Sequence, residues 1–262
     1  MLSSPIASPS PAFRNLHLLN QLIRRDFSAR FTGSALGLGW AVLQPLTLVI
    51  LYWFVFTFMI PQGPGAKSNG YVQFLIAGLV PWIGFNEGIM RSTTSIVDNA
   101  TIVRRLAFRS ELLIVVPNAS AIIFETIAIA LFFLFLAATR SVSPMIWVLP
   151  FALLLQLAIQ VGIGWFLAAV YVFFRDVSQV LGFVLSIVFY LSPILYPVSG
   201  RFESLFFWNP LTPLLGLFRS AMIGSALPPA MSIVFLLIVA MVTFCGGLAF
   251  FRRTQATLAD FV

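Results

Sequence analysis

The chain has 262 residues, of which 60% are hydrophobic and 9% are charged, with 15 Lys and Arg against 8 Asp and Glu. An ordinary soluble domain carries roughly 25% charged residues, so these proportions exclude a cytosolic enzyme, a secreted disulfide scaffold and a disordered protein, and they place much of the chain in lipid. The single cysteine, Cys245, excludes an intrachain disulfide, and with the single histidine, His17, it excludes a zinc site of His and Cys ligands.

The N-terminal region divides into two segments. Residues 1–13 are rich in Ser and Pro and lack a periodic apolar face, so we expect a disordered cytoplasmic tail and no secretory signal. Residues 14–33 are expected to form an amphipathic helix, because apolar residues recur every three or four positions at Leu16, Leu19, Ile23, Phe27 and Phe31. The opposite face is polar and basic, which predicts a helix lying on the membrane surface before the first span.

Two interpretations of this interface helix stay open. It is either a simple basic anchor or a gate helix that changes conformation. In the second case its functional residues are Arg24, Arg25, Phe27 and Arg30.

Long uncharged or nearly uncharged runs follow, and spanning the bilayer core takes about 20 residues of helix. They predict membrane helices near residues 36–60, 70–91, 112–138, 145–173, 178–197 and 230–251. The expected fold is therefore an all-α polytopic membrane protein in which residues 34–262 form a six-helix domain.

A further apolar run, residues 204–218, is treated separately. It holds Pro210 and Pro213 and lies between Arg201 and Arg219. The run is too short to span, and proline lacks the backbone donor that helix bonding needs. We therefore expect a broken, re-entrant outer segment over residues 198–229, with Arg201 and Arg219 at the outer surface.

The basic residues predict orientation. The net charge is +7, and such an excess in a membrane protein indicates orientation and anionic lipid rather than nucleic acid. Of the 15 Lys and Arg residues, all but Lys67, Arg140, Arg201 and Arg219 fall on the side that carries both termini, which predicts cytoplasmic termini. Lys67 is the only lysine and follows Ala66, so a phosphate-binding Gly-Lys-[Ser/Thr] loop is excluded and any ATP must be bound by another subunit.

Four motifs in order carry a family resemblance. The first surrounds the start of the first span, the second is Phe174–Val177, the third is Leu191–Pro197 and the fourth is Asn209–Thr212 followed by Arg219. The residues of the first motif are Arg25, Asp26, Arg30, Ser34, Leu36, Gly37, Trp40 and Pro45. This chain resembles the permease subunits of ABC-2 type exporters, and among them those for O-antigen, teichoic acid and capsular polysaccharide.

The resemblance implies a homodimeric pore in the bacterial inner membrane, with two copies of a separate ATP-binding subunit that hold ATP and Mg. The cargo it implies is a lipid-linked glycan, as in lipopolysaccharide biosynthesis, and this chain would hold no cofactor and bind no nucleic acid. Three alternatives stay open: an ABC-2 permease for a drug or a lipid, a membrane enzyme acting on polyprenyl-linked substrates, and a stand-alone secondary transporter.

The loop over residues 92–111 resembles the family's coupling helix, which transmits closure of the ATPase dimer to the membrane. Relatives often have proline after the loop phenylalanine, whereas this chain has Arg109. A basic loop without a partner is the alternative. The coupling residues would be Ile102, Val103, Arg104, Arg105, Leu106, Phe108 and Arg109.

Aromatic residues make up 15% of the chain, and most of them suit lipid contact and interfacial belts. Some could instead stack on sugar rings along a channel. The channel candidates are Trp40, Gln44, Thr47, Tyr52, Trp53, Phe56, Phe183, Phe189 and Tyr190, and the pore-exit candidates are Asn209, Pro210 and Arg219. Glu125, deep in the third span, is read as either a structural or a functional carboxyl.

Overall fold

The computed structural model describes residues 11–30, 32–55, 58, 68–101, 110–138, 143–197 and 206–261. Within these ranges the regular structure is helical, and no strand occurs. The helices are α1 (Pro11–Ala29), η1 (Gly37–Gly39), α2 (Trp40–Phe54), α3 (Ser68–Asp98), α5 (Glu111–Ala138), η3 (Ile146–Val148), α6 (Leu149–Phe173), α7 (Val177–Leu191), α9 (Leu211–Ile223) and α10 (Ala230–Phe261). The all-α prediction is confirmed.

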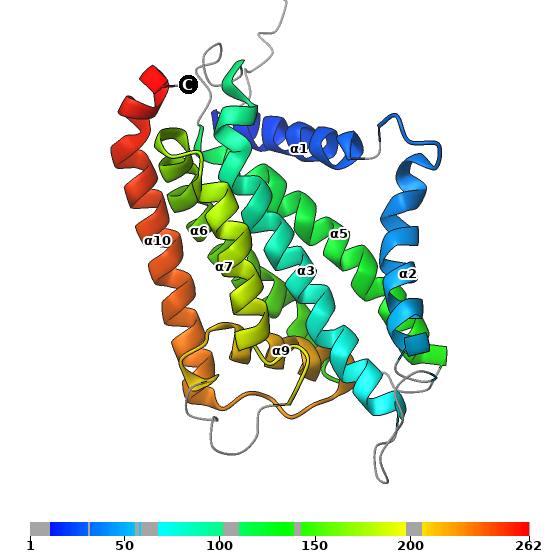
Figure 1. Cartoon of the computed structure of the whole chain (residues 1–262). Coiled ribbons are helices and arrows are strands. Elements are labelled where there is room, and N and C mark those ends of the chain that lie inside the picture. Colours follow the sequence, from blue (N-terminus) through cyan, green and yellow to red (C-terminus); the bar gives the residue numbers. More distant parts are fainter. Residues whose placement is uncertain are drawn as a thin grey trace, which may run out of the picture.

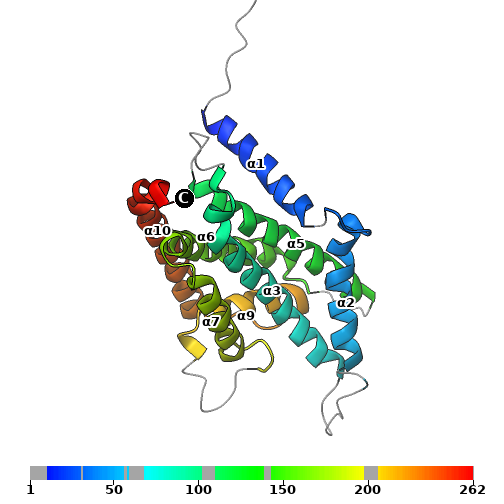
Figure 2. The same ribbon diagram turned by 45° about the horizontal axis from the view of Figure 1, so that its top comes forward.

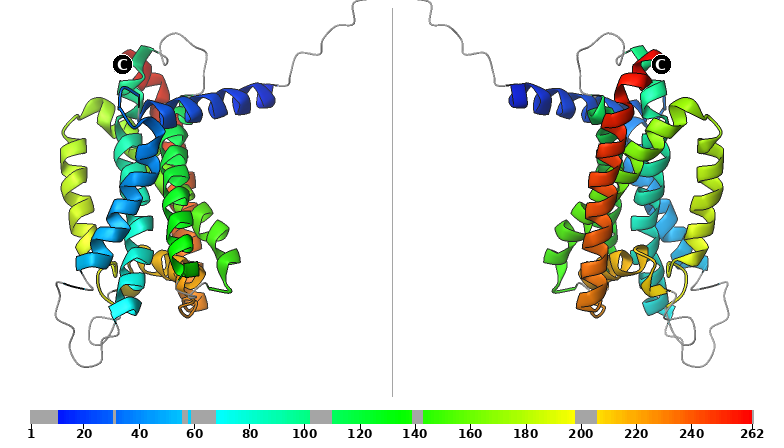
Figure 3. Two further views of the ribbon diagram at one scale, coloured as in Figure 1. Left: turned by 90° about the vertical axis from the view of Figure 1, so that its right-hand side faces the viewer. Right: turned by 90° about the vertical axis from the view of Figure 1, so that its left-hand side faces the viewer.

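The helices form a bundle with two distinct ends. Helices α2, α3, α5, α6, α7 and α10 run between the ends, α1 lies across one end, and α9 lies across the opposite end (Figures 1 and 3). Helix α1 and the C-terminal end of α10 share one end of the bundle (Figure 1). In the described part of the chain, four helices are long and apolar enough to cross a membrane, namely Gly70–Asp98, Glu111–Ala138, Ile146–Phe173 and Ala230–Gln255. This is the architecture of a multi-pass membrane protein.

Several helix ends differ from the sequence expectation. Helix α1 begins at Pro11 and ends at Ala29, earlier than residues 14–33 at both ends. Helix α3 continues to Asp98, so the first part of the expected 92–111 loop is helix. Helix α7 ends at Leu191 rather than near residue 197, because Ser192 precedes Pro193 and adopts extended backbone (φ −102°, ψ 148°), as residues before proline commonly do.

The segment before the last helix, which was expected to lie on the outer side, contains an ordered helix, α9. The expectation that Pro210 and Pro213 would interrupt it was wrong, because Pro210 is the N-cap residue and Pro213 lies in the first turn. Backbone N–H groups in the first turn have no partner within a helix, so proline is tolerated there. Helix α9 ends at Ile223, and the capping residue after it, Gly224, has the left-handed φ of 69° that favours glycine.

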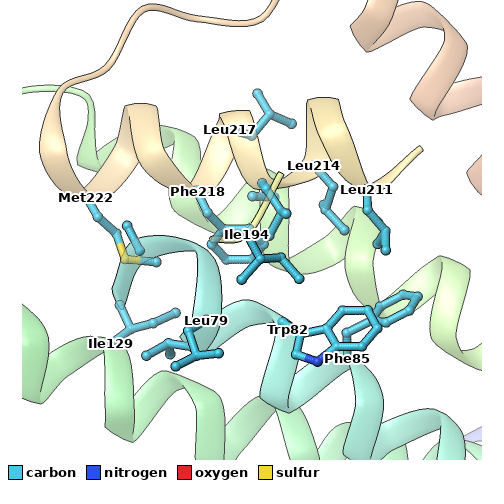
Figure 4. Close-up of a cluster of buried hydrophobic side chains, with 14 of the residues drawn as sticks. Leu79, Trp82, Phe85, Ile129, Ile194, Leu211, Leu214, Leu217, Phe218 and Met222 are labelled. Atoms are coloured by element: carbon cyan, nitrogen blue, oxygen red, sulfur yellow. The ribbon is translucent and has the colours of Figure 1, made fainter. Parts of the chain in front are cut away.

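The core is centred on α3, which contacts α5, α6, α7 and α9. At the end of the bundle opposite α1, one face of α9 packs onto α3 (Figure 4). That contact is made by Leu211, Leu214, Phe218 and Met222 of α9 and by Leu79, Trp82 and Phe85 of α3, with Ile129 of α5 and Ile194 alongside. Helix α9 is thus a buried part of the fold that lies across the bundle.

Candidate functional site

The predicted coupling residues are Ile102, Val103, Arg104, Arg105, Leu106, Phe108 and Arg109, and all of them lie outside the described residues. Their neighbours are described. Helix α3 ends at Asp98 and α5 begins at Glu111, both at the end of the bundle where α1 lies (Figure 1). The coupling segment therefore joins the two helices that α1 contacts at that end.

The interface helix α1 is joined to α3 by interleaved ion pairs. Asp26 Oδ1 accepts a hydrogen bond from Arg91 Nη2 at 2.6 Å. Arg30 pairs with Glu87, and Glu87 Oε1 also lies 3.9 Å from Arg91 Nη1. These side chains are between one-eighth and one-third exposed, so solvent screens the pairs only in part. Glu87 and Arg91, four residues apart on α3, thus form ion pairs with α1 in addition to the contact between them.

Apolar contacts support these ion pairs. Phe27 of α1 packs against Ala41 of α2 and Phe124 of α5. The Arg30 guanidinium lies 5.3 Å from the centre of the Phe124 ring, a geometry that favours cation–π attraction. Burial lowers the pKa of Arg30, and the nearby Glu87 carboxylate offsets part of this effect. Arg24 and Arg25, the other predicted interface residues, are exposed.

The predicted channel residues lie on two helices that flank α3. Helix α2 stands on one side of α3 and α7 on the other (Figures 1 and 2). Trp40 and Trp53 of α2 are exposed, and Phe183 and Tyr190 of α7 are 69% and 65% exposed. These four aromatics have faces that the monomer leaves uncovered.

The remaining channel candidates have other surroundings. Tyr52 and Phe189 pack against the main core cluster, and the Phe189 ring centre lies 5.6 Å from that of Trp82. The exposed Thr47 donates its hydroxyl hydrogen bond to the Leu43 carbonyl within its own helix, at 2.7 Å. Gln44 is exposed, and Phe56 lies outside the described residues.

A large apolar cleft lies beside α7. Its volume is about 1240 Å³, and it is lined by residues of α3, α6, α7 and α10. Asn209 and Pro210, next to the start of α9, also line it. Asn209 donates to the Leu191 carbonyl and to Ser192 Oγ, and its side-chain oxygen accepts from the Leu211 amide. Asn209 therefore joins the end of α7 to the start of α9.

Arg219 does not occupy the outer surface as expected. Its side chain is buried, with the residue 6% exposed, and the guanidinium lies 3.6 Å from the centre of the Phe74 ring. It donates to the carbonyls of Ile194 and Phe74 at 3.1 and 3.4 Å. The residue pins α9 to α3 and to the turn after α7, so it is not placed to attract a passing anion. Arg201, its expected partner at the surface, lies outside the described residues.

Glu125 belongs to a buried polar cluster that joins α3, α5 and α6. The residue is 1% exposed, and Oε2 accepts a hydrogen bond from Gln156 Nε2 at 2.5 Å. Gln160 donates to the Gly84 carbonyl at 2.8 Å. A side chain at position 84 would overlap the Glu125 carboxyl, so glycine lets α3 and this carboxyl approach closely. The cluster favours the structural interpretation of Glu125.

The two glutamines were missed at the sequence level. They are polar residues four apart in an otherwise apolar run, which is a readable signal for one buried polar helix face. Among the described residues, no group of three or more His, Cys, Asp or Glu residues could hold a metal ion.

Comparison with known proteins gives consistent matches. The family described as "ABC-2 type transporter" matches residues 17–223. An O-antigen export system permease protein RfbA from Klebsiella pneumoniae is 26% identical over 251 residues, which cover 93% of this chain and 94% of the relative. The RfbA protein of Myxococcus xanthus has the same identity and coverage. The polysialic acid transport protein KpsM of Escherichia coli is 25% identical over 91% of this chain and 94% of its own length.

Proposed function

The chain belongs to the ABC-2 type transporter family, and from this premise we propose that it is the membrane-spanning permease subunit of an ABC exporter for a lipid-linked polysaccharide. The observation that carries the proposal is its likeness, over more than nine-tenths of both chains, to permeases named for O-antigen export and polysialic acid transport. The chain is a transport subunit and not an enzyme, and ATP hydrolysis resides in a separate subunit.

The proposed topology has six membrane crossings with both termini in the cytoplasm, in a bacterial inner membrane. Supporting it, α2 and α7 run between the same two ends as the four long helices, although each has only 15 residues. Helix α9 lies across the outer end (Figure 3), where it would form a re-entrant segment. Helix α1 and the C-terminal end of α10 lie at the same end of the bundle, which agrees with an even number of crossings (Figure 1).

The proposed assembly is a homodimer with two ATP-binding subunits that hold ATP and Mg. The exposed aromatic faces of α2 and α7, on either side of α3, support a second copy that would complete a channel. Trp40, Trp53, Phe183 and Tyr190 would offer ring faces to sugars along that channel. The coupling residues 102–109 would contact the ATP-binding subunit, because they join α3 to α5 at the cytoplasmic end.

Reconstitution tests this function. The chain and its ATP-binding partner are placed in proteoliposomes, and ATP hydrolysis is measured with and without a lipid-linked glycan. Hydrolysis is expected to require both chains and to rise with the glycan, and Arg104→Glu with Arg105→Glu is expected to remove the glycan response. Hydrolysis by this chain alone would refute the subunit assignment. Stimulation by a drug or a simple lipid, but not by the glycan, would refute the cargo.

A further inference from the structure

A polar groove lies between the interface helix and the bundle, at the end that carries both termini. It has a volume of about 320 Å³ and is lined by α1, α3 and α5, within the size range of small-molecule sites. Four charged residues line it, Arg25 and Asp26 from α1 and Arg91 and Asp98 from α3. The lining is thus balanced, with two guanidinium groups and two carboxylates.

Two of these side chains each have one buried polar atom without a hydrogen-bond partner in the described part of the chain. Asp26 and Arg91 bond to each other through Oδ1 and Nη2 at 2.6 Å. Asp26 Oδ2 and Arg91 Nη1 are buried and have no hydrogen-bond partner among the described residues, since Nη1 lies 3.9 Å from the nearest Glu87 oxygen. An unpaired buried polar atom is costly, so these groove-lining side chains carry one acceptor and one donor that the described residues leave unsatisfied.

The charges decide the kind of ligand that fits. A simple anion in the groove would meet the two carboxylates, and a simple cation would meet the two guanidinium groups. A zwitterion satisfies both, because its anionic group accepts from Arg91 Nη1 while its cationic group donates to Asp26 Oδ2. Asp98, whose Oδ2 accepts from Thr94 at 2.6 Å, adds a second carboxylate for the cation.

The α5 side of the groove is apolar, with Leu113, Val116 and Pro117, and Leu22 and Ala29 of α1 also line it. The α3 side is polar, because Thr94, Ser95 and Asn99 line it together with Arg91 and Asp98. Polar and charged groups on one side and apolar groups on the other suit an amphiphile. The amphipathic pattern of α1 places that helix at the bilayer surface, where the zwitterions available are lipid headgroups.

We propose that this groove binds the headgroup of a phosphoethanolamine lipid, with the phosphate on Arg91 and Arg25 and the ammonium on Asp26 and Asp98. The bound lipid would bridge α1 to α3 and α5 beside their existing ion pairs. This site goes beyond the export function proposed above. It concerns the membrane lipid rather than the cargo, so either proposal can fail while the other stands.

Lipid retention tests the site directly. The purified transporter is equilibrated in vesicles with a fixed fraction of anionic lipid and either phosphatidylethanolamine or phosphatidylcholine, and retained lipids are counted by native mass spectrometry. Phosphatidylcholine carries the same charges, but its quaternary ammonium has no N–H donor. Wild-type protein is expected to prefer phosphatidylethanolamine by about tenfold, the order expected for one charge-assisted hydrogen bond.

Three variants make the test specific. Asp26→Asn and Asp98→Asn are expected to reduce the preference to about twofold or less, and Asp98→Asn leaves the Asp26–Arg91 pair in place. Asp176→Asn is the matched control, because this exposed residue makes the same charge change at the same end outside the groove. Hydrogen exchange of α1 amides should be slower with phosphatidylethanolamine in the wild type and in the control variant only.

Two results would overturn the proposal. The first is equal retention of the two lipids by the wild type. The second is an unchanged preference in both Asp26→Asn and Asp98→Asn when their unfolding profiles match that of the control variant. Tighter retention of the anionic lipid by these variants than of phosphatidylethanolamine by the wild type would identify a plain anion site, and would also refute the zwitterion assignment. Export measured in parallel reports on the function proposed above.

Discussion

Adding one methyl group at Gly247 is expected to separate α6 from α10. These two helices make the most extensive helix–helix contact in the described structure, and they meet backbone to backbone at two glycines. A Cβ atom at position 247 would overlap the carbonyl oxygen of Gly162 and lie 2.8 Å from its carbonyl carbon. A Cβ atom at position 162 would lie 2.6 Å from the Phe244 amide nitrogen. Small residues at such crossings let membrane helices approach closely.

The size of the effect follows from what must move. The obstacle is backbone rather than a flexible side chain, so Gly247→Ala can be accommodated only by shifting a whole helix. Overpacking costs about 1–3 kcal/mol where side chains can repack, and the backbone clash places this case at about 3 kcal/mol. For a chain of this size that corresponds to a drop of roughly 6–12 °C in the midpoint of thermal unfolding.

The neighbouring glycine provides the matched control. Gly246 lies on the same helix, and a Cβ atom there would have no heavy atom within 4 Å. Alanine is also the better helix former by up to about 1 kcal/mol, so Gly246→Ala should leave the midpoint unchanged or raise it. Both variants are purified in the same detergent and unfolded by heat. Equal midpoints for the two variants would refute the close crossing of α6 and α10.

Three further changes test other parts of the structure. Gln156→Leu is expected to lower the free energy of unfolding by about 2 kcal/mol, because it leaves the Glu125 carboxyl buried without its donor. Adding Glu125→Leu should recover most of this loss, as measured by thermal unfolding. No recovery would mean that the two side chains are not coupled. Tyr190→Ala should slow glycan export and leave thermal unfolding unchanged. Phe189→Ala should instead lower the free energy of unfolding by about 2 kcal/mol, because the Phe189 ring packs on a core tryptophan. The reverse pattern would contradict the placement of the two rings. Arg219→Lys is expected to cost about 2 kcal/mol, because an ammonium group lacks the planar fork that stacks and donates at this buried site, and a wild-type midpoint would contradict that role.

The sequence predicted the long helices well because their cause is local. A long run without charge must be shielded from water whatever its neighbours are. Its length and composition are therefore enough to predict a membrane helix. The end of α7 was misjudged although its cause is also local, since Ser192 before Pro193 departs from helical backbone. The start of α9 was misjudged for a related reason, because proline breaks a helix interior but is accepted in the first turn.

Other features depend on residues that are distant in sequence. Arg219 bounds an apolar run and reads as a surface residue, and only the fold brings Phe74 beneath it. The pair Asp26–Arg91 spans 65 positions, so its existence depends on how α1 turns back over α3. Such contacts carry no signal in composition or periodicity. Gln156 is a different case. An amide side chain in an apolar run indicates that a buried polar partner exists, although the sequence does not show which residue that partner is.

Polar contacts hold helix α3 at both ends and in its middle. Arg219 and α9 hold one end of it, hydrogen bonds from Gln156 and Gln160 hold its middle, and the ion pairs with α1 hold its other end. A force applied at the segment after α3 is therefore expected to move α3 as a unit with α1, α5 and α6. A cleft of about 1240 Å³ lies beside α7, and α2 and α7 carry the exposed aromatic rings. We expect these two helices to shift relative to that unit, which would change the spacing of the proposed channel surface.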